Sequence, residues 1–298
     1  MPDFIVTLSQ TLQDSSLLYI SYSVLLGLVV GSFLNVVIYR MPKIMEQQWQ
    51  EQARQILTDD LAISTQQNQE KTTTYSLSKP RSSCPKCSHQ ITALENIPVI
   101  SYLILGGKCS ACKTKISMRY PLIELLTATL AGLVAYKFGY SFATFGALLF
   151  VFALITLTFI DFDTQYLPDD ITLPLLWLGL IFNINQSFTD LASAVIGAVV
   201  GYIILWSVNA LFKLYKGIDG MGYGDFKLLA AIGAWFGWQI LPAVILLSAG
   251  VGAVIGICLM IFAKHGREVP IPFGPYLALG GISALFFGPQ LASIYLIS

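Results

Sequence analysis

Residues 142–163 read FATFGALLFVFALITLTFIDFD, an uncharged run that ends in two carboxylates. About twenty apolar residues can cross the hydrocarbon core of a bilayer as a helix. Similar runs recur along most of this 298-residue chain, which is 55% hydrophobic and only 11% charged. We therefore predict an all-α polytopic membrane protein. A soluble domain, a nucleic-acid binder and an outer-membrane barrel, whose strands would alternate with period two, are excluded.

The other apolar runs predict about eight membrane helices in total. The first covers residues 17–39 and is not a cleavable signal peptide, because no Lys or Arg precedes it. The remaining seven are expected at 120–138, 142–160, 171–186, 190–212, 227–241, 243–263 and 273–296. Pro242 alone separates the spans 227–241 and 243–263, so the boundary between these two helices is predicted at this proline.

The basic residues predict the orientation of the chain. Most of the seventeen Lys and Arg residues lie within 40–119. By the positive-inside rule this segment is cytoplasmic, and eight spans place both termini in the periplasm. We thus predict a first span in 1–42, a cytoplasmic loop at 43–119 and a seven-span domain at 120–298. The Gln- and Thr-rich residues 43–77 have little to bury and predict an exposed helix or spacer.

Four cysteines form two CxxC pairs, Cys84 with Cys87 and Cys109 with Cys112. This spacing is typical of a tetrahedral zinc site, and four thiolates leave no position for water. The predicted site is therefore structural. Two disulfides or four free thiols are the alternatives, but disulfides are rare in a reducing cytoplasm. His89 is close enough in sequence to be a spare ligand, but we expect it to be a solvated loop histidine.

Two aspartates are predicted near the cytoplasmic edge of the membrane. Asp161 follows the apolar run, and Asp225 ends the sequence MGYGD directly before another span. A carboxylate at membrane depth costs about 3 kcal/mol, so such residues are usually functional. Water activation needs two carboxyl groups, one that takes a proton and one that donates it. The alternatives are a solvated Asp161 and an Asp225 that caps the next helix.

Neighbouring residues support or limit this pair. Gly222 and Gly224 would let the backbone approach an extended substrate. Lys227 is expected to anchor the helix at the cytoplasmic side or to tune Asp225. Asp163 and Asp169 are predicted to be a solvated residue and a helix cap. Because Asp161 ends its predicted helix and Asp225 starts one, the helix dipoles predict Asp161 as the acid and Asp225 as the base.

These motifs resemble those of the bacterial type IV prepilin leader peptidase and N-methyltransferase family, which are GxGD-type membrane aspartic proteases. Asp161 and the sequence Gly222-Tyr223-Gly224-Asp225 resemble the two aspartyl-protease motifs of this family. Further matching segments are GSFLNVVIYRMP at 31–42, PRSSCPKC at 80–87, ENIP at 95–98, RYP at 119–121 and LPD at 167–169. The resemblance covers almost the whole chain.

The resemblance implies an enzyme of the bacterial inner membrane. It would cleave the leader of type IV prepilins or type II secretion pseudopilins after a glycine, at the cytoplasmic face. It would then methylate the new N-terminal residue with S-adenosylmethionine, beside a structural Zn²⁺. The implied partners are these substrates and the lipid bilayer, without nucleic acid. Within the polar cysteine module we single out Glu95 and Asn96 for methyl transfer.

Two other functions would use the same residues. An ion-coupled transporter would carry protons or cations on Asp161 and Asp225, but its site should lie near the midplane of the membrane. A membrane adaptor with a zinc ribbon and no chemistry would leave the glycine-flanked Asp225 unexplained. Leader cleavage by the purified protein would separate the enzyme from both alternatives.

Overall fold

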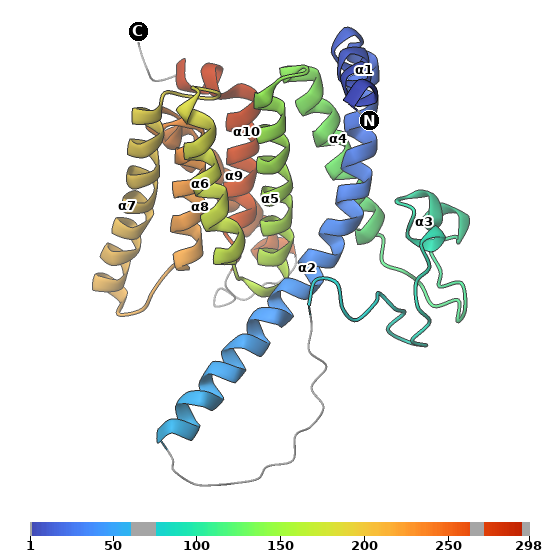
Figure 1. The fold of residues 1–298 in the computed structure, drawn as a ribbon. Helices are drawn as coiled ribbons and strands as arrows, with labels where there is room; N and C mark the ends of the chain where they lie inside the picture. The colour runs from blue at the N-terminus through green and yellow to red at the C-terminus, as the bar shows by residue number, and fades with distance from the viewer. Residues whose placement is uncertain (1, 61–75, 263–270, 294–298) are drawn as a thin grey trace. The chain divides into compact units, whose positions relative to one another are not determined.

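The computed structural model describes residues 2–60, 76–262 and 271–293, and nearly all of its regular structure is helical (Figure 1). The helices are α1 (Pro2–Asp14), α2 (Ser16–Asp60), α3 (Ile100–Ile104), α4 (Arg119–Phe138), α5 (Phe142–Thr164), α6 (Asp169–Ile184), α7 (Leu191–Lys216), α8 (Tyr223–Phe236), α9 (Leu241–Phe262) and α10 (Gly274–Ser293). Two 3₁₀ turns, η1 (Leu94–Asn96) and η2 (Trp238–Ile240), complete the regular elements. The described residues form no sheet, only two isolated β-bridges. The predicted all-α class is confirmed.

Each predicted span corresponds to a helix, but not every helix is long enough to cross a bilayer alone. Among the described residues, five segments are sufficiently long and apolar: Ser16–Ile56, α4, α5, α7 and Trp238–Phe262. The 16 residues of α6 and the 14 residues of α8 extend only about 24 and 21 Å at 1.5 Å per residue. A hydrocarbon core is about 30 Å thick. The count of eight spans therefore remains a prediction.

Two helix boundaries differ from the predicted ones. The first span was expected to close near Pro42, but α2 continues through this proline to Asp60. The residues beyond Pro42 are rich in Gln and Glu, which favour helix. A helix is thus present within the predicted stretch 43–77 as far as Asp60, and residues 61–75 lie outside the described part. The other boundary falls at Gly237, which has a φ of +83°, and not at Pro242. Pro242 lies in the first turn of α9, where its missing N–H costs little.

The chain divides into two compact units, and each is described separately. One comprises Met1–Gly27 and Leu126–Ser298, and the other comprises Leu28–Leu125. The division into 1–42, 43–119 and 120–298 follows functional segments and remains a prediction.

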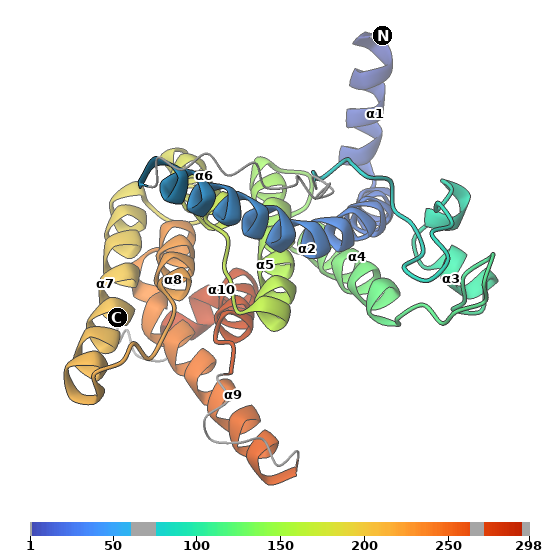
Figure 2. The same ribbon diagram turned by 90° about the horizontal axis from the view of Figure 1, so that it is seen from below.

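Helix α8 lies at the centre of the larger unit, where it packs against α6, α7 and α10 (Figure 2). Its apolar residues are buried on every side, from Phe226 to Trp235. The contact with α7 is close because Gly197 and Gly233 face each other, and a Cβ on either glycine would collide with the carbonyl oxygen of the other. The position of Asp225, in the first turn of α8, is therefore fixed by packing.

A buried amide fixes the opposite end of α8. Asn183 of α6 is fully buried, and its Nδ2 donates to the carbonyl oxygens of Ala234 and Trp235, both at 2.9 Å. Its Oδ1 accepts hydrogen bonds from the backbone N–H groups of Phe188 and Thr189. These bonds satisfy carbonyl groups that the end of a helix leaves free.

In the smaller unit, buried polar side chains of α2 and α4 hold the irregular segments. Arg40 of α2 is only 6% exposed, and its guanidinium donates to the carbonyl oxygens of Ser76, Leu77 and Pro80 at 2.5–3.1 Å. On α4, Glu124 accepts a hydrogen bond from the N–H of Val99 at 2.8 Å. The segment before the first cysteine pair and the segment between the two pairs are thereby attached to helices.

Candidate active site and metal centre

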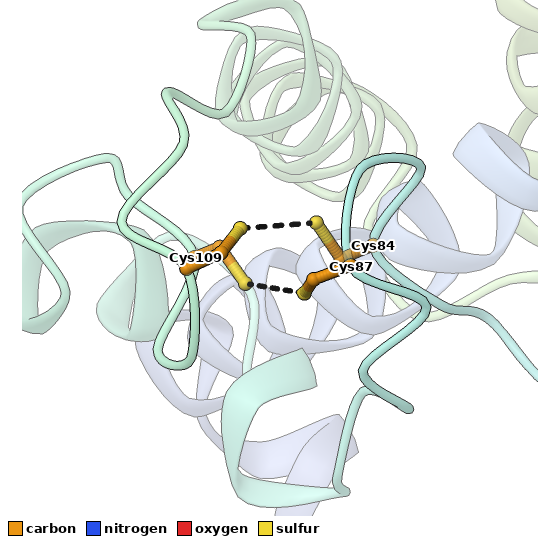
Figure 3. Close-up of side chains that lie close together, drawn as sticks. Cys84, Cys87 and Cys109 are labelled. Carbon is orange, nitrogen blue, oxygen red and sulfur yellow. Dashed lines mark hydrogen bonds between the residues drawn. The ribbon is translucent and has the colours of Figure 1, made fainter.

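The four cysteines of the smaller unit come together in one cluster. Their Sγ atoms all lie within 4.8 Å of one another. Cys84 faces Cys112 at 3.7 Å, and Cys87 faces Cys109 at 3.9 Å (Figure 3). A tetrahedral ion with metal–sulfur bonds of about 2.3 Å requires sulfurs about 3.8 Å apart. The predicted cluster is confirmed as a set of ligands that could hold a metal ion.

The two CxxC turns have the same backbone conformation. The residue after each second cysteine, Ser88 or Lys113, has a positive φ of 59° or 58°. Its N–H donates to the carbonyl oxygen of the first cysteine, Cys84 or Cys109, at 2.9 or 3.0 Å. Two equivalent turns therefore present their sulfur pairs to each other, which is a geometry that two unrelated turns would rarely produce.

At two of the four cysteines, hydrogen bonds favour the thiolate form that a metal requires. Cys112 Sγ lies 3.2 Å from Oγ1 of Thr114, and hydrogen bonds from this hydroxyl and from the Thr114 N–H lower the pKa of Cys112 to about 6. The N–H groups of Lys86 and Cys87 lower the pKa of Cys84. Burial and the neighbouring cysteine thiols instead raise the pKa of Cys87 to about 12. Since the thiolate is the metal ligand, the surroundings favour the binding form at Cys84 and Cys112.

Glu95, one of the two residues singled out for methyl transfer, is held beside this cluster. Its Oε2 accepts hydrogen bonds from the N–H and hydroxyl of Thr92 at 2.8 and 2.9 Å, and its Oε1 lies 3.3 Å from Nε2 of His89. Hydrogen bonds from Ser110 and Thr92 lower the pKa of Glu95 to about 2. His89 thus contacts Glu95 and lies outside the four-cysteine cluster, while Asn96 is exposed. Glu95 is an ionised, positioned carboxylate.

The larger unit brings the two predicted aspartates together. Asp161 lies in the last turn of α5 and Asp225 in the first turn of α8. They are only 4% and 7% exposed, and they are close enough that the charge of Asp161 acts on Asp225. The alternative of a solvated Asp161 is wrong. Asp225 is not the cap of its helix either, because Gly222 occupies the N-cap position.

The two carboxyl groups have different partners. Oδ2 of Asp161 accepts a hydrogen bond from the backbone N–H of Gly274, the first residue of α10, at 2.9 Å. Oδ1 of Asp225 is a buried oxygen without a hydrogen-bond partner among the described residues. A buried, unsatisfied carboxylate oxygen destabilises a fold and is usually retained for a function. Asp225 therefore has an oxygen ready to engage a ligand.

The glycines of the MGYGD sequence have separate roles. A Cβ on Gly224 would lie 2.6 Å from Cβ of Leu167, so the packing of Leu167 requires glycine there. A Cβ on Gly222 would have only Oδ2 of Asp225 within 4 Å, at 3.7 Å. The expectation that both glycines leave room for a substrate therefore fits Gly222, whereas the space at Gly224 is occupied by a leucine.

Lys227 and Asp169 form an ion pair beside the aspartates. Nζ of Lys227 lies 2.7 Å from both carboxylate oxygens of Asp169. Lys227 lies two positions after Asp225 in α8, and Asp169 is the first residue of α6. The ion pair therefore joins the beginnings of these two helices. Asp163, which was predicted to be solvated, is exposed. The prediction that Asp169 caps its helix is wrong, because Pro168 occupies the N-cap position of α6 and no side-chain cap bond forms there. Lys227 thus supports the motif through Asp169.

The loop that leads to Asp225 is fixed by Asn209, a residue that the sequence did not indicate. Oδ1 of this buried asparagine accepts hydrogen bonds from the N–H groups of Gly220 and Met221 at 2.8 and 3.1 Å. Its Nδ2 donates to Asp219, which also pairs with Lys213 at 2.9 Å.

The sequence did not indicate Gly274 either, because 113 positions separate it from Asp161. Only the Gly–Pro pair that opens α10 could have drawn notice.

Comparisons with known proteins agree with this arrangement. The chain matches a family model described as the bacterial Peptidase A24 N-terminal domain over residues 25–138, and one described as the type IV leader peptidase family over 148–257. The second range contains both aspartates. No solved structure matches the chain.

Curated relatives are similar over almost their whole length. A protein of Pseudomonas aeruginosa named prepilin leader peptidase/N-methyltransferase is 51% identical over 96% of both chains. Proteins of the same name from Aeromonas salmonicida and Neisseria gonorrhoeae are 52% and 53% identical, over 94% and 86% of both chains.

Proposed function

Because the chain belongs to the type IV leader peptidase family, we propose that it cleaves the leader peptide of type IV prepilins and then N-methylates the new N-terminal residue. The observation that carries this proposal is the buried pair of carboxyl groups, Asp161 and Asp225, which α5 and α8 bring together. Hydrolysis of a peptide bond next to a membrane needs such a pair, because water is a weak nucleophile until a base removes its proton.

Both aspartates act as catalytic residues in this proposal. Asp161, ionised, takes a proton from water as the oxygen attacks the scissile carbonyl carbon, and Asp225 donates its proton to the carbonyl oxygen. The C–N bond then breaks, Asp161 returns a proton to the leaving amine, and Asp225 recovers its own. The N–H of Gly274 stabilises a charge on Asp161. This hydrogen bond favours the reverse of the assignment predicted from the helix dipoles alone.

Methyl transfer uses a different chemistry, in which a neutral amine attacks the methyl group of S-adenosylmethionine. The protein must hold the amine in line with the methyl group, and positioning supplies most of the rate. Glu95 and Asn96 are our candidates for this role. The Glu95 carboxylate is ionised at neutral pH, which suits an amine or a sulfonium partner.

We propose that the ion of the cysteine cluster is Zn²⁺ and that it is structural. Four thiolates close its coordination sphere, so the ion would stabilise the module without binding water. The basic residues of 40–119 support a cytoplasmic module and periplasmic termini in the inner membrane. Pseudopilins of type II secretion are further proposed substrates. Ion transport is not favoured, because the relatives are named as peptidases.

The decisive experiment uses the purified full-length protein in lipid nanodiscs with a type IV prepilin. Mass spectrometry should show loss of the leader and, with S-adenosylmethionine present, addition of one methyl group to the new N-terminus. A chain with Asp161→Asn and Asp225→Asn together serves as the inactive control. Intact prepilin after incubation with the wild-type protein would refute the proposal.

A further inference from the structure

The hydrogen bond between Gly274 and Asp161 joins two segments that are far apart in sequence. Gly274 is the first residue of α10, and its N–H donates to Oδ2 of Asp161 at 2.9 Å within the protein interior. Asp161 is 4% exposed, so water does not compete freely for this oxygen. The bond therefore sets which oxygen of the carboxyl group is occupied and which way the group faces.

The missing side chain of Gly274 matters as much as its N–H. A Cβ at this position would lie 2.7 Å from Oδ2 and 3.2 Å from Cγ of Asp161, and 3.1 Å from Cδ2 of Leu167. A contact of 2.7 Å between a carbon and a carboxylate oxygen is well inside the ordinary separation of about 3.5 Å. Any other residue would thus push the carboxyl group away from the position it now occupies.

Leu167 connects this contact to the second aspartate motif. One side of its side chain fills the space at Gly224, and its Cδ2 approaches Gly274. Leu167 therefore lies between the glycine that opens α10 and the glycine that precedes Asp225. Together these contacts join α5, α8 and α10 at the carboxyl pair.

We propose that Gly274 is a positioning residue of the aspartate pair. Its N–H holds Oδ2 of Asp161, and its lack of a side chain creates the place where this carboxyl group lies. One oxygen of Asp161 is then left for the attacking water. The inference rests on the proposed peptidase function, because it assigns Gly274 a part in cleavage that acts through Asp161.

The test compares Gly274→Ala with the wild-type protein in nanodiscs, on prepilin and on a pilin already trimmed to its mature N-terminus. We expect the kcat of cleavage to fall about a hundredfold, as misplacement of a catalytic group by about 1 Å can cause. KM should change less than about twofold, because substrate binding is retained. Methylation of the trimmed pilin should stay at the wild-type rate.

Gly281→Ala is the matched control for general disturbance of helix packing. Gly281 lies on the same helix, and a Cβ there would meet Leu154 and Ile232 at 3.1 Å but no carboxyl group. Overpacking of this kind costs about 1–3 kcal/mol of folding stability. We therefore expect the folded variant to lose stability but to keep most of the wild-type cleavage rate. Equal losses of cleavage in Gly274→Ala and Gly281→Ala would overturn the inference in favour of a packing role.

A second variant separates Asp161 from Leu167 as the group through which Gly274 acts. Leu167→Ala removes the leucine atoms near Gly274 and leaves the aspartate unchanged. If Gly274 positions Asp161, adding Gly274→Ala to Leu167→Ala still lowers kcat about a hundredfold. Rescue of cleavage in the double variant would overturn the inference. Failure of the wild-type protein to cleave prepilin would instead refute the proposed function itself.

Discussion

Four aspartates lie within residues 161–170, but their surroundings separate them. Asp161 is buried and faces Asp225, whereas Asp163 is exposed and Asp169 is paired with Lys227. General acid and base catalysis contributes about 10² to 10⁴ to a rate. We expect Asp161→Asn or Asp225→Asn to lower leader cleavage at least a hundredfold, measured by mass spectrometry of prepilin.

Asp163→Asn is the matched control for these two variants. Its side chain is exposed two positions from Asp161, so the variant should keep nearly full cleavage. Substantial cleavage by either Asp161→Asn or Asp225→Asn would end the aspartyl mechanism. A loss of cleavage in Asp163→Asn alone would show that Asp163, and not Asp161, is the first catalytic aspartate.

The ion pair of Lys227 and Asp169 should have a smaller effect. The Asp169 side chain is 53% exposed and that of Lys227 is 27% exposed, so solvent screens the pair. Such pairs contribute about 0.2–1 kcal/mol, which corresponds to at most about a fivefold change in rate. Asp169→Asn should therefore retain at least a fifth of the wild-type kcat/KM. A loss beyond a hundredfold would show that Lys227 acts on Asp225.

At the scale of single residues, the sequence could predict the residues that carry charge but not the groups that position them. Asp161 and Asp225 stand out because a carboxyl group directly next to an apolar run is rare. Gly274 has no such signal, since a glycine is ordinary in an apolar chain, and Leu167 was indicated only as part of the LPD segment that resembles the family. Their importance arises only from a tertiary contact between residues 113 positions apart.

At the scale of elements, the cysteine module is the part that we expect to depend on a metal. Among the described residues, only the isolated β-bridges Ser83–Gln90 and Lys108–Lys115 flank its two CxxC turns, so we expect ligand bonds to supply much of their stability. We expect one zinc ion per chain, measured by elemental analysis of protein purified without chelator. Cys109→Ser should lower the zinc content and loosen the module, while the aspartate pair remains intact. A metal-free wild-type protein with an ordered module would contradict this.

Arg40 is predicted to attach the entry of this module to α2. Its guanidinium serves three carbonyl groups, and hydrogen bonds to a charged donor contribute about 1.5–3 kcal/mol each. Arg40→Ala should therefore destabilise the segment near Ser76 and Pro80 by about 3 kcal/mol or more. Hydrogen exchange of this segment would measure the effect, with the exposed Arg81→Ala as control. Equal exchange in the two variants would contradict the assignment.

Helix boundaries show where local sequence signals suffice. Gly237, with its positive φ, ends α8, whereas Pro242 lies inside the next helix and stops nothing. A proline ends a helix only when its missing N–H would otherwise be bonded. Pro42 differs from Pro242, because it lies inside α2 and its missing N–H does remove a helical hydrogen bond. Strong helix formers on its far side nevertheless continue α2.

At the scale of the whole molecule, composition was enough to predict the class of fold but not the number of crossings. Hydropathy identifies apolar segments, yet α6 and α8 are shorter than a hydrocarbon core is thick. Helix α8 is apolar because it is buried among α6, α7 and α10, and not because it faces lipid. Sequence alone cannot distinguish these two reasons for an apolar helix.

The two compact units carry the two sets of polar groups separately. The aspartate pair belongs to the unit that contains Leu126–Ser298, and the cysteine cluster with Glu95 belongs to Leu28–Leu125. Hydrolysis requires carboxyl groups in two protonation states, whereas methyl transfer requires only a positioned neutral amine. The two reactions should therefore be separable by single substitutions in different units.

We expect Asp225→Asn to methylate a pilin already trimmed to its mature N-terminus at the wild-type rate, although it no longer cleaves prepilin. Glu95→Gln is the reciprocal variant: it keeps the size of the side chain, removes the charge, and should lower methylation at least tenfold while cleavage persists. Mass spectrometry of both substrates measures both reactions. Methyl transfer itself requires no pair of carboxyl groups. If Asp225→Asn fails to methylate the trimmed pilin while the wild-type protein succeeds, Asp225 takes part in methyl transfer, and the two reactions share one site.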